Sequence, residues 1–244
     1  MKTAQQNALN QALEWRDGQP YSTQFQDIYF SSDDGLAETD YVFLQGNDLP
    51  KRFQQLDLNS SEFIIIETGF GTGLNFLCVA KLWLELAPVN ARLHFISTEK
   101  YPLSLSDVAA AHALWCGLKV LSQEFLLSYP TLLDANQTAS LFDDRVQLTL
   151  LIGDANITLK DLAIKADAWF LDGFAPVKNP DMWQAELFSQ MARLSNPGTT
   201  FATFTSAGTV RRGLQAAGFS VTKQPGFGKK REMLIGQYIG LDTR

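Results

Sequence analysis

The segment 63–75 reads FIIIETGFGTGLN and places glycines at three alternate positions shortly after a run of four apolar residues. The apolar run contains three β-branched residues and predicts a strand that is buried on both faces. An apolar helical pattern begins at Leu74, directly after Gly69, Gly71 and Gly73. Because glycine lets the backbone approach a ligand closely, and a helix start offers unpaired N–H groups, the loop is predicted to hold a small molecule.

Length and charge limit the kinds of protein that this glycine loop can serve. With 244 residues, 45% of them hydrophobic, the chain is long enough for one sizeable core and too short for two full domains. The formal net charge is -6, from 20 basic and 26 acidic residues. Such a chain is not a general polyanion binder, so any contact with nucleic acid must be local.

Neither the cysteines nor the N-terminus points to an extracellular or membrane protein. Cys78 lies in an apolar helical pattern and Cys116 follows Trp115, without the spacing of a metal or redox pair. We interpret both as small core residues in a reducing compartment. The first residues lack an apolar signal core, and no run approaches the ~20 apolar residues of a membrane helix. A soluble, cytoplasmic protein without membrane contact is expected.

Strand and helix patterns alternate from residue 63 onward, which predicts parallel strands joined by crossover helices. The predicted strands are 63–67, 92–98, 145–152, 167–171, 199–204, 219–224 and 231–239. The predicted helices lie near 74–86, 104–115, 118–128, 155–163, 179–194 and 206–217. Only a short turn at 225–228 joins the last two strands, so they should be antiparallel neighbours. The predicted fold is α/β, with a mostly parallel seven-stranded sheet and one reversed strand.

The chain before this alternating region predicts a small β appendage and an insert. Asp17-Gly18 is a strong hairpin turn pair, flanked by the candidate strands 13–16 and 21–25. A short helix is predicted from Leu36 to Leu44. The aromatic residues around it are interpreted mostly as packing residues, namely Tyr29, Phe30, Tyr41 and Phe43. We expect residues 1–55 to form the hairpin appendage and insert, and residues 56–244 to form the main domain.

The glycine loop does not match the two common phosphate-binding patterns. A dinucleotide fingerprint needs a glycine at its sixth position, but the sixth residue counted from Gly69 is Leu74, and from Gly71 it is Phe76. No Lys-Ser/Thr pair follows, as a P-loop requires. The ligand of this loop is therefore not predicted to be held by its phosphates.

Four acidic residues stand at the ends of four predicted strands. They are Glu67, Glu99, Asp154 and Asp172. Since the carboxyl ends of parallel strands meet at one ligand crevice, the four carboxylates should converge there. They would repel a pyrophosphate. They suit S-adenosylmethionine, whose sulfonium and ammonium outweigh its carboxylate and whose adenosine needs hydrogen-bond acceptors.

Three of these carboxylates are assigned to the cofactor from their places in the sheet. Glu99 is predicted to accept the ribose hydroxyls, although NAD-binding proteins place an acid there too. Asp154, followed by Ala155, is predicted to accept from the adenine amino group, and Glu67 to lie near the methionine end. A helix N-cap or a solvated loop acid is the alternative for each. The predicted cofactor site is completed by Gly69, Phe70, Gly71 and Gly73.

Asp172 has the most informative surroundings of the four. It follows the buried run 168–171 and precedes Gly-Phe-Ala-Pro, so a carboxylate, an aromatic ring and a proline meet at the sheet edge. This arrangement resembles the acidic or amide residue before Pro-Pro-aromatic in amino-group methyltransferases. An alkylamine is mostly protonated at neutral pH, and a nearby carboxylate can accept a proton from it and direct its lone pair. Asp172 is the predicted catalytic residue, with helix capping as the alternative.

Other chemistries find little support in the sequence. The chain has two histidines, His94 and His112, and no Gly-x-Ser-x-Gly elbow, which argues against a hydrolase triad. Both histidines are interpreted as structural. Asp33-Asp34-Gly35 lacks the rest of a calcium loop, so no metal site is predicted.

A basic segment near the C-terminus carries a local excess of positive charge. Between Thr205 and Ile235, six basic residues stand against one acidic residue, Glu232. The basic residues are Arg211, Arg212, Lys223, Lys229, Lys230 and Arg231. They suit the phosphates of RNA, but on charge alone a solvated face that aids solubility is an equal alternative.

Several segments together resemble one family of tRNA-modifying enzymes. They are 27–31 (DIYFS), 35–44 (GLAETDYVFL), 67–76 (ETGFGTGLNF), 170–183 (FLDGFAPVKNPDMW), 202–215 and 226–234. The resemblance runs over nearly the whole chain, and the stretch 172–183 is highly specific. On these motifs the sequence resembles the methyltransferase domain of the bifunctional tRNA 5-methylaminomethyl-2-thiouridine biosynthesis proteins.

The resemblance implies a class I, Rossmann-like, S-adenosylmethionine-dependent methyltransferase domain. The implied reaction is methylation of the exocyclic amine of 5-aminomethyl-2-thiouridine at the tRNA wobble position. Asp172 would then orient the amine, while Phe174 would stack on the base and Lys178 would meet a phosphate. The β appendage would approach the anticodon arm together with Arg211, Lys229, Lys230 and Arg231.

In the familiar bifunctional form of this family, an FAD-dependent oxidase domain first removes a carboxymethyl group. This chain ends at Arg244, soon after the last predicted strand, so no FAD activity is expected from it. The amine would come from a fused oxidase domain or from a separate upstream enzyme, and both a stand-alone protein and an excised domain fit. A small-molecule amine methyltransferase and a catalytically dead nucleotide-binding module are the alternative functions.

Overall fold

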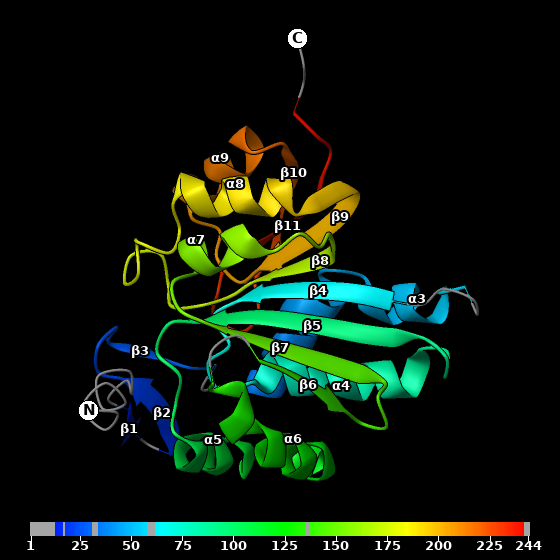
Figure 1. The fold of residues 1–244 in the computed structure, drawn as a ribbon. Helices are drawn as coiled ribbons and strands as arrows, with labels where there is room; N and C mark the ends of the chain where they lie inside the picture. Colours follow the sequence, from blue (N-terminus) through cyan, green and yellow to red (C-terminus); the bar gives the residue numbers. More distant parts are fainter. Residues whose placement is uncertain (1–12, 17, 31–33, 58–61, 135–136, 242–244) are drawn as a thin grey trace.

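Two β-sheets and their covering helices make up the computed structural model, which describes residues 13–16, 18–30, 34–57, 62–134 and 137–241 (Figure 1). A small three-stranded antiparallel sheet comes first in the chain, and an eight-stranded mixed sheet follows. Among the described residues, no helix has the length and apolar character needed to cross a membrane.

The strands of the large sheet lie in the order β10-β11-β9-β8-β4-β5-β7-β6. In that order their bounds are Phe219–Pro225, Glu232–Tyr238, Ser195–Thr203, Ala166–Leu171, Glu62–Thr68, Arg92–Glu99, Val146–Ile152 and Thr138–Leu141. The five neighbours β9-β8-β4-β5-β7 are parallel. Strand β11 runs antiparallel to both β9 and β10. All seven predicted strands are confirmed, including the reversed one.

An eighth strand, β6, corrects the predicted seven-stranded sheet. It pairs antiparallel with β7 at the edge of the sheet. Its sequence TASL has Leu141 as its one buried residue, so no apolar alternation marks it as a strand. Its place at the edge explains this pattern, because an edge strand can leave most of its side chains in solvent.

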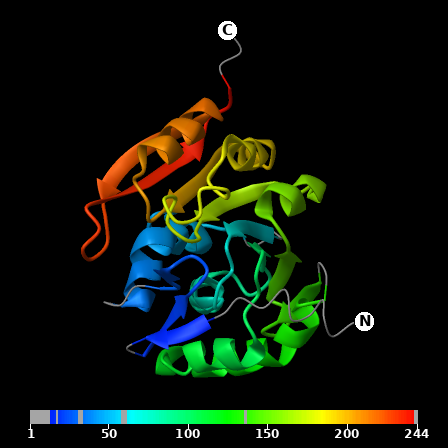
Figure 2. The ribbon, with the colours of Figure 1, turned by 90° about the vertical axis from the view of Figure 1, so that its left-hand side faces the viewer.

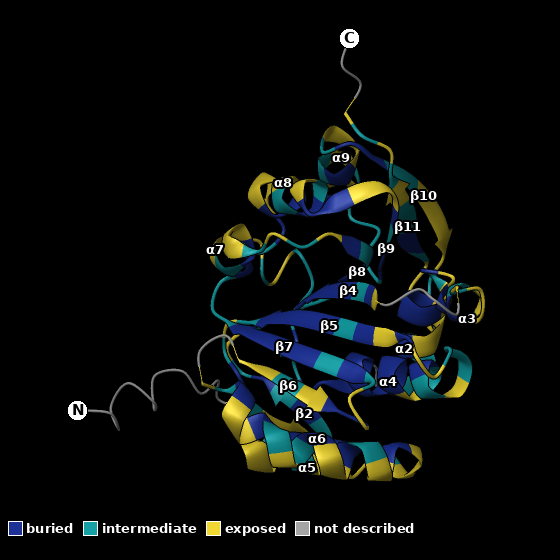
Figure 3. Ribbon diagram, turned by 45° about the vertical axis from the view of Figure 1, so that its right-hand side comes forward, coloured by how far each residue is buried: buried dark blue, intermediate teal, exposed yellow. Residues whose placement is uncertain are grey.

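The central strands are buried on both faces, as the apolar run in β4 predicts. Ile65 and Ile66 are fully buried and belong to opposite core layers. Helices α4, α5 and α6 cover one face of the sheet, and α7, α8 and α9 cover the other (Figure 1). Their bounds are Leu74–Leu86, Leu105–His112, Lys119–Leu132, Ala155–Thr158, Ala185–Arg193 and Gly208–Ala216. Figure 3 shows buried strands between helices whose outer faces are exposed.

Several helix ends differ from the prediction. The helix predicted at 179–194 starts only at Ala185, because the preceding residues form turns in which the N–H of Trp183 donates to the carbonyl of Pro180. The helix predicted at 118–128 continues to Leu132 with Pro130 inside it. The helix predicted at 104–115 ends at 112. Turns account for the first and third differences, whereas α6 continues past Pro130, a residue that usually ends a helix.

The small sheet confirms the predicted hairpin. Strands β1 (Leu13–Arg16) and β2 (Gln19–Ser22) pair antiparallel, and β3 (Asp27–Ile28) pairs with β2. Asp17 of the predicted turn lies outside the described residues, while Gly18 has a φ of +77°, which suits glycine. Figure 2 faces the side of the molecule on which this sheet lies.

The insert between the two sheets contributes to the core. Helix α2 (Gly35–Thr39) continues into a π-helix (Asp40–Gln45), which together match the predicted helix, and α3 (Leu49–Gln54) follows. Val42 and Phe53 are fully buried in the same core layer as α4. The insert therefore packs against the large sheet as part of one hydrophobic core.

Candidate active site

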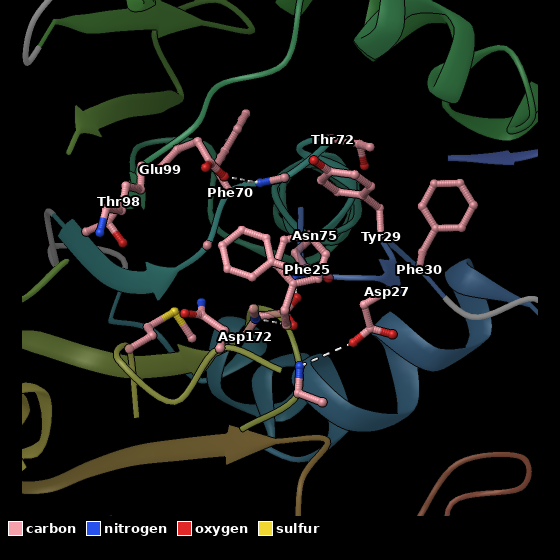
Figure 4. A pocket seen from close by; sticks show the side chains of 18 of the residues that line it. Phe25, Asp27, Tyr29, Phe30, Phe70, Thr72, Asn75, Thr98, Glu99 and Asp172 are labelled. Carbon is pink, nitrogen blue, oxygen red and sulfur yellow. Dashed lines mark hydrogen bonds between the residues drawn. The ribbon is translucent and has the colours of Figure 1, made fainter. Parts of the chain in front are cut away.

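A cavity of about 410 Å³ lies at the carboxyl ends of the parallel strands, within the size range of small-molecule sites. Its walls come from the glycine loop after β4, the ends of β5, β7 and β8, the small sheet and α2 (Figure 4). Among the residues predicted to form the site, those that line the cavity are Gly69, Phe70, Gly71, Glu99, Asp154, Ala155, Asp172, Phe174 and Lys230.

The three glycines of the loop all have left-handed backbones. Their φ angles are +79° at Gly69, +56° at Gly71 and +77° at Gly73. A Cβ atom at Gly73 would lie 2.8 Å from the ring of Phe70, so this glycine makes room for an aromatic ring of the loop itself. Gly73 is the N-cap of α4 and is not one of the described residues that line the cavity. Gly69 and Gly71 line the cavity, and the ring of Tyr29 lies against Gly71.

Glu99, the last residue of the neighbouring strand β5, is hydrogen-bonded to the glycine loop. One carboxylate oxygen accepts the backbone N–H of Gly71 at 2.9 Å, and the other accepts that of Tyr101 at 2.8 Å. Burial raises the pKa of Glu99, while these N–H donors act in the opposite direction. Each carboxylate oxygen has a second lone-pair direction, so Glu99 can still accept from hydroxyl groups in the cavity.

Asp154 is the N-cap of α7, the role that the sequence offered as the alternative to cofactor binding. Its carboxylate accepts the N–H of Asn156 at 2.9 Å and the ammonium of Lys100 at 2.9 Å. Burial raises the pKa of Asp154, but the hydrogen bonds from Lys100 and Asn156 outweigh it and leave that pKa lowered. Asp154 is therefore an ionised acceptor at the cavity wall, with Ala155 next to it.

Asp172 follows β8 and is held by two donors (Figure 4). Its Oδ1 atom accepts the N–H of Gly173 at 2.7 Å, and its Oδ2 atom accepts the side-chain amide of Asn75 at 2.7 Å. Its own carbonyl oxygen accepts the hydroxyl of Thr68, also at 2.7 Å. Burial raises the pKa of Asp172 to about 6, against the effect of both donors. Near neutral pH, Asp172 is a fixed and poorly hydrated carboxylate.

Glu67 lies behind this group rather than in the cavity wall. It is fully buried, and its two oxygens accept from the Asn75 amide at 2.8 Å and the Ser97 hydroxyl at 2.7 Å. The oxygen of the Asn75 amide in turn accepts the Thr39 hydroxyl at 2.8 Å. Burial raises the pKa of Glu67 well above its ordinary value, and the charge of Asp172 adds to this rise.

Asn75, which the sequence interpretation left without a role, is therefore the residue that joins Glu67 to Asp172. It lines the cavity although it belongs to the apolar helix α4. Its sequence context carries a usable indication, because Asn75 is the only polar residue of the first turns, LNFLCVA, of a buried helix. A buried amide at such a position has to find hydrogen-bond partners.

Replacing Glu67 by glutamine is expected to stabilise the fold by about 1–3 kcal/mol at pH ~8, because glutamine has no buried acid group that must either ionise or hold a proton, and an oxygen remains for Asn75. Because the pKa of Glu67 is raised in the folded state, that state binds more protons than the unfolded state at every pH between the ordinary and the raised pKa. Stability therefore falls as the pH rises through that window, and the advantage of E67Q should grow with pH.

Urea denaturation between about pH 5 and about pH 8 measures this difference. Glu186→Gln is the matched control, because Glu186 is exposed on α8 and lies outside the cavity wall. A gain for E67Q that shrinks with rising pH would contradict a raised pKa for Glu67.

The predicted substrate residues Phe174 and Lys178 contact the small sheet. The Phe174 ring stacks on Phe25 with centroids 4.6 Å apart and an angle of 21°, and Tyr29 meets it edge-on at 5.3 Å. Lys178 donates to the carbonyl of Gln26 and is not one of the described residues that line the cavity. One face of Phe174 is thus already covered within the protein. Tyr29 is one of the aromatic residues interpreted from the sequence as packing residues, whereas no role was predicted for Phe25.

The predicted basic residues are not gathered around the cavity. Within the described part of the chain, Arg211, Lys229 and Arg231 lie outside its lining, and Lys230 lies inside it. The Lys230 ammonium is 2.6 Å from the Glu38 carboxylate and 4.3 Å from the centroid of the Phe204 ring. The cavity thus receives one cation of the basic segment, and that cation is paired.

Comparison with known proteins places this cavity in a family context. A family model described as "S-adenosyl-L-methionine-dependent methyltransferase" matches residues 117–239, just over half of the chain. The chain belongs to this methyltransferase family. The predicted class I, S-adenosylmethionine-dependent methyltransferase fold is thereby confirmed.

Relatives of the methyltransferase chain carry a more specific name. This chain is 54% identical over 227 residues to a protein of Methylobacillus flagellatus, and the match covers 93% of this chain and 35% of the relative. It is 56% identical over 224 residues to one of Chromobacterium violaceum, covering 92% and 34%. Both are named "tRNA 5-methylaminomethyl-2-thiouridine biosynthesis bifunctional protein MnmC". The chain spans about a third of these relatives, and the predicted resemblance is confirmed.

A solved structure supports the fold of this methyltransferase. The crystal structure of MNMC2 from Aquifex aeolicus matches with a TM-score of 0.71 and 22% sequence identity. The match covers 96% of this chain and 73% of that one. It therefore includes the small sheet and the insert as well as the large sheet.

Proposed function

We propose that this methyltransferase transfers a methyl group from S-adenosylmethionine to the primary amine of 5-aminomethyl-2-thiouridine at the wobble position of tRNA. The observation that carries the proposal is the carboxylate of Asp172, which two N–H donors fix at the cavity wall beside the glycine loop. The name of the relatives, which share more than half of their matched residues with this chain, supplies the substrate.

The cavity suits the proposed methyl donor. The bare backbone at Gly69 and Gly71 leaves room for its methionine part, and Phe70 lies in the same loop. Glu99 is proposed to accept the ribose hydroxyls, and Asp154 and Ala155 to contact the adenine. S-adenosylmethionine supplies an electrophilic methyl group on a sulfonium, and the acidic lining favours that positive charge. Glu67 and Gly73 are proposed to act indirectly, by holding Asn75 and the start of α4.

Asp172 is proposed to hold the attacking nitrogen. A primary amine needs a free lone pair in line with the methyl group, and a carboxylate that accepts one of its N–H bonds sets that direction. Since both oxygens of Asp172 already accept from fixed donors, the carboxylate cannot rotate freely. The gain is one of orientation, so it should appear in the rate of transfer rather than in the affinity for the methyl donor.

Aromatic and basic residues around the cavity are proposed to hold the tRNA. The pair of Phe174 and Phe25 offers an aromatic wall for the wobble base, in place of the single ring predicted from the sequence. Phosphates of the anticodon arm would meet basic side chains of the C-terminal segment and the loop before α8, namely Lys178, Arg211, Lys229, Lys230 and Arg231.

The domain division and the source of the amine also remain proposals. We propose residues 1–55 as an appendage and insert on a methyltransferase domain of residues 56–244. The amine would be supplied by an FAD-dependent oxidase, either fused to this domain or separate from it. That the chain covers about a third of its relatives agrees with a fused partner in those proteins.

Nucleoside analysis tests the proposed function directly. The protein is incubated with S-adenosylmethionine carrying a labelled methyl group and with tRNA that contains 5-aminomethyl-2-thiouridine. Label is expected in 5-methylaminomethyl-2-thiouridine, and no label is expected with tRNA that contains 2-thiouridine. Absence of label in the aminomethyl tRNA, with S-adenosylmethionine bound by calorimetry, would rule out this substrate. Absence of both would indicate a dead site.

A further inference from the structure

An alkylammonium group already occupies one corner of the cavity. The ammonium of Lys230 lies 2.6 Å from the Glu38 carboxylate and 4.3 Å from the Phe204 ring centroid. A carboxylate combined with an aromatic face is the arrangement that binds alkylammonium ions most directly. Glu38, Phe204 and Lys230 all line the cavity, and we refer to Glu38 and Phe204 as the ammonium pocket.

The ammonium pocket lies beside Asp172. Phe204 follows the end of β9, and Asp172 follows the end of the neighbouring parallel strand β8. On the other side, Glu38 precedes Thr39, whose hydroxyl donates to the amide of Asn75 that holds Asp172. Both carboxylates line the cavity, one from the insert and one from the large sheet, and the charges of Glu38 and Lys230 shift the pKa of Asp172 up and down, respectively.

The two partners of the ion pair differ in their freedom to move. The Glu38 side chain is 12% exposed, whereas that of Lys230 is 44% exposed and belongs to the turn between β10 and β11. Lys230 can therefore leave towards solvent while Glu38 stays in the wall. A cation that leaves a carboxylate behind makes room for another cation of the same chemical kind.

We propose that the ammonium pocket recognises the protonated aminomethyl group of the substrate uridine, and that Lys230 fills the pocket until the substrate arrives. This inference rests on the proposed function. An aminomethyl group is a short alkylammonium, like the end of a lysine side chain, and it fits the same carboxylate and ring. The bound ammonium has to lose one proton before its nitrogen can attack the methyl group, and the carboxylate of Asp172 is the proposed acceptor of that proton. The displaced Lys230 then has an RNA phosphate as its natural partner. Glu38 thus becomes a specificity residue that separates aminomethyl uridine from uridines without an amine.

The test compares the binding of two tRNAs that have the same phosphates and differ only in the amine. Binding of tRNA with 5-aminomethyl-2-thiouridine and of tRNA with 2-thiouridine is measured with S-adenosylhomocysteine present, so that no transfer occurs. The ratio of the two dissociation constants is the readout. The native protein is expected to prefer the aminomethyl tRNA about tenfold, because one charged hydrogen-bonded contact is gained.

Four variants are expected to have different effects on this ratio. Glu38→Gln should bring the ratio close to one, while Glu38→Asp should keep a preference. Phe204→Leu should lower it about threefold or more. Lys230→Met removes the internal competitor, which raises the ratio, and also the phosphate contact of the displaced lysine, which lowers it. This variant is therefore measured at high salt, where the phosphate contact is weakened and the ratio should rise. The exposed residues Glu186 and Lys119 provide the matched controls Glu186→Gln and Lys119→Gln.

The inference is overturned if Glu38→Gln keeps the native ratio, or if the native protein binds both tRNAs equally well. Transfer of labelled methyl to the aminomethyl tRNA by the native protein is measured in parallel. If that transfer fails, the proposed function fails. If it succeeds and the ratio is unchanged by Glu38→Gln, only the ammonium pocket is wrong.

Discussion

Asp172→Ala is expected to slow methyl transfer at least about 100-fold in a single turnover, while the affinity for S-adenosylmethionine changes less than about threefold. The side chain contributes the acceptor that sets the direction of the amine, and alanine offers none. Binding of the methyl donor should persist, because Gly69, Gly71 and Glu99 keep their places. Quench experiments with saturating S-adenosylmethionine measure the rate, and calorimetry measures the affinity.

The control for this variant is Asp161→Ala, since Asp161 is exposed in the short 3-10 helix after α7 and is not one of the described residues that line the cavity. Turnover of the Asp172 variant within about threefold of the native rate would remove Asp172 from the catalytic role. A variant that also lost the methyl donor would instead indicate that the aspartate supports the cofactor site as a whole.

Asn75→Asp is expected to destabilise the fold by about 3–5 kcal/mol at neutral pH, because it places a third carboxylate between Glu67 and Asp172 and removes their shared donor. The loss should shrink on acidification, as the carboxylates become protonated. It should also shrink in the double variant with Glu67→Gln, which removes one of the repelling charges. Urea denaturation of the single and double variants measures the coupling between the two sites.

Asn90→Asp makes the same chemical change at an exposed position and serves as the control. If Asn75→Asp were as stable as Asn90→Asp at every pH, the buried amide would not be holding the two carboxylates. A loss that grew on acidification would contradict repulsion between ionised groups.

Local patterns in the sequence were sufficient for most of the large sheet. The apolar run before Gly69 predicted a strand buried on both faces, and alternation of strands and helices predicted the parallel core. Strand β6 escaped because an edge strand buries little. Such patterns record which side chains of a segment are buried, so they are weakest for a segment whose side chains are mostly exposed to solvent.

The same limit explains which parts of the site were predicted. That Glu99, Asp154 and Asp172 reach one crevice follows from topology, because parallel strands end at the same edge. Glu67 lies behind the cavity wall and shares the Asn75 amide with Asp172, and the pairing of Asn75 with Asp172 joins residues 97 positions apart. The pairing of Lys230 with Glu38 spans 192 positions. No local spacing encodes contacts of this range.

The hydrogen bond from Thr39 to Asn75 has a consequence for how the enzyme can be divided. The Asn75 amide donates with its nitrogen to the carboxylates of Glu67 and Asp172, so its oxygen faces Thr39 and the Thr39 hydroxyl acts as the donor. The carboxylates of Glu67 and Asp172 therefore set the direction of these bonds, and the Thr39 hydroxyl completes them from the insert. A segment that precedes the glycine loop thus supplies the last partner of the amide that holds Asp172, and the large sheet without the insert would leave that amide oxygen without its donor.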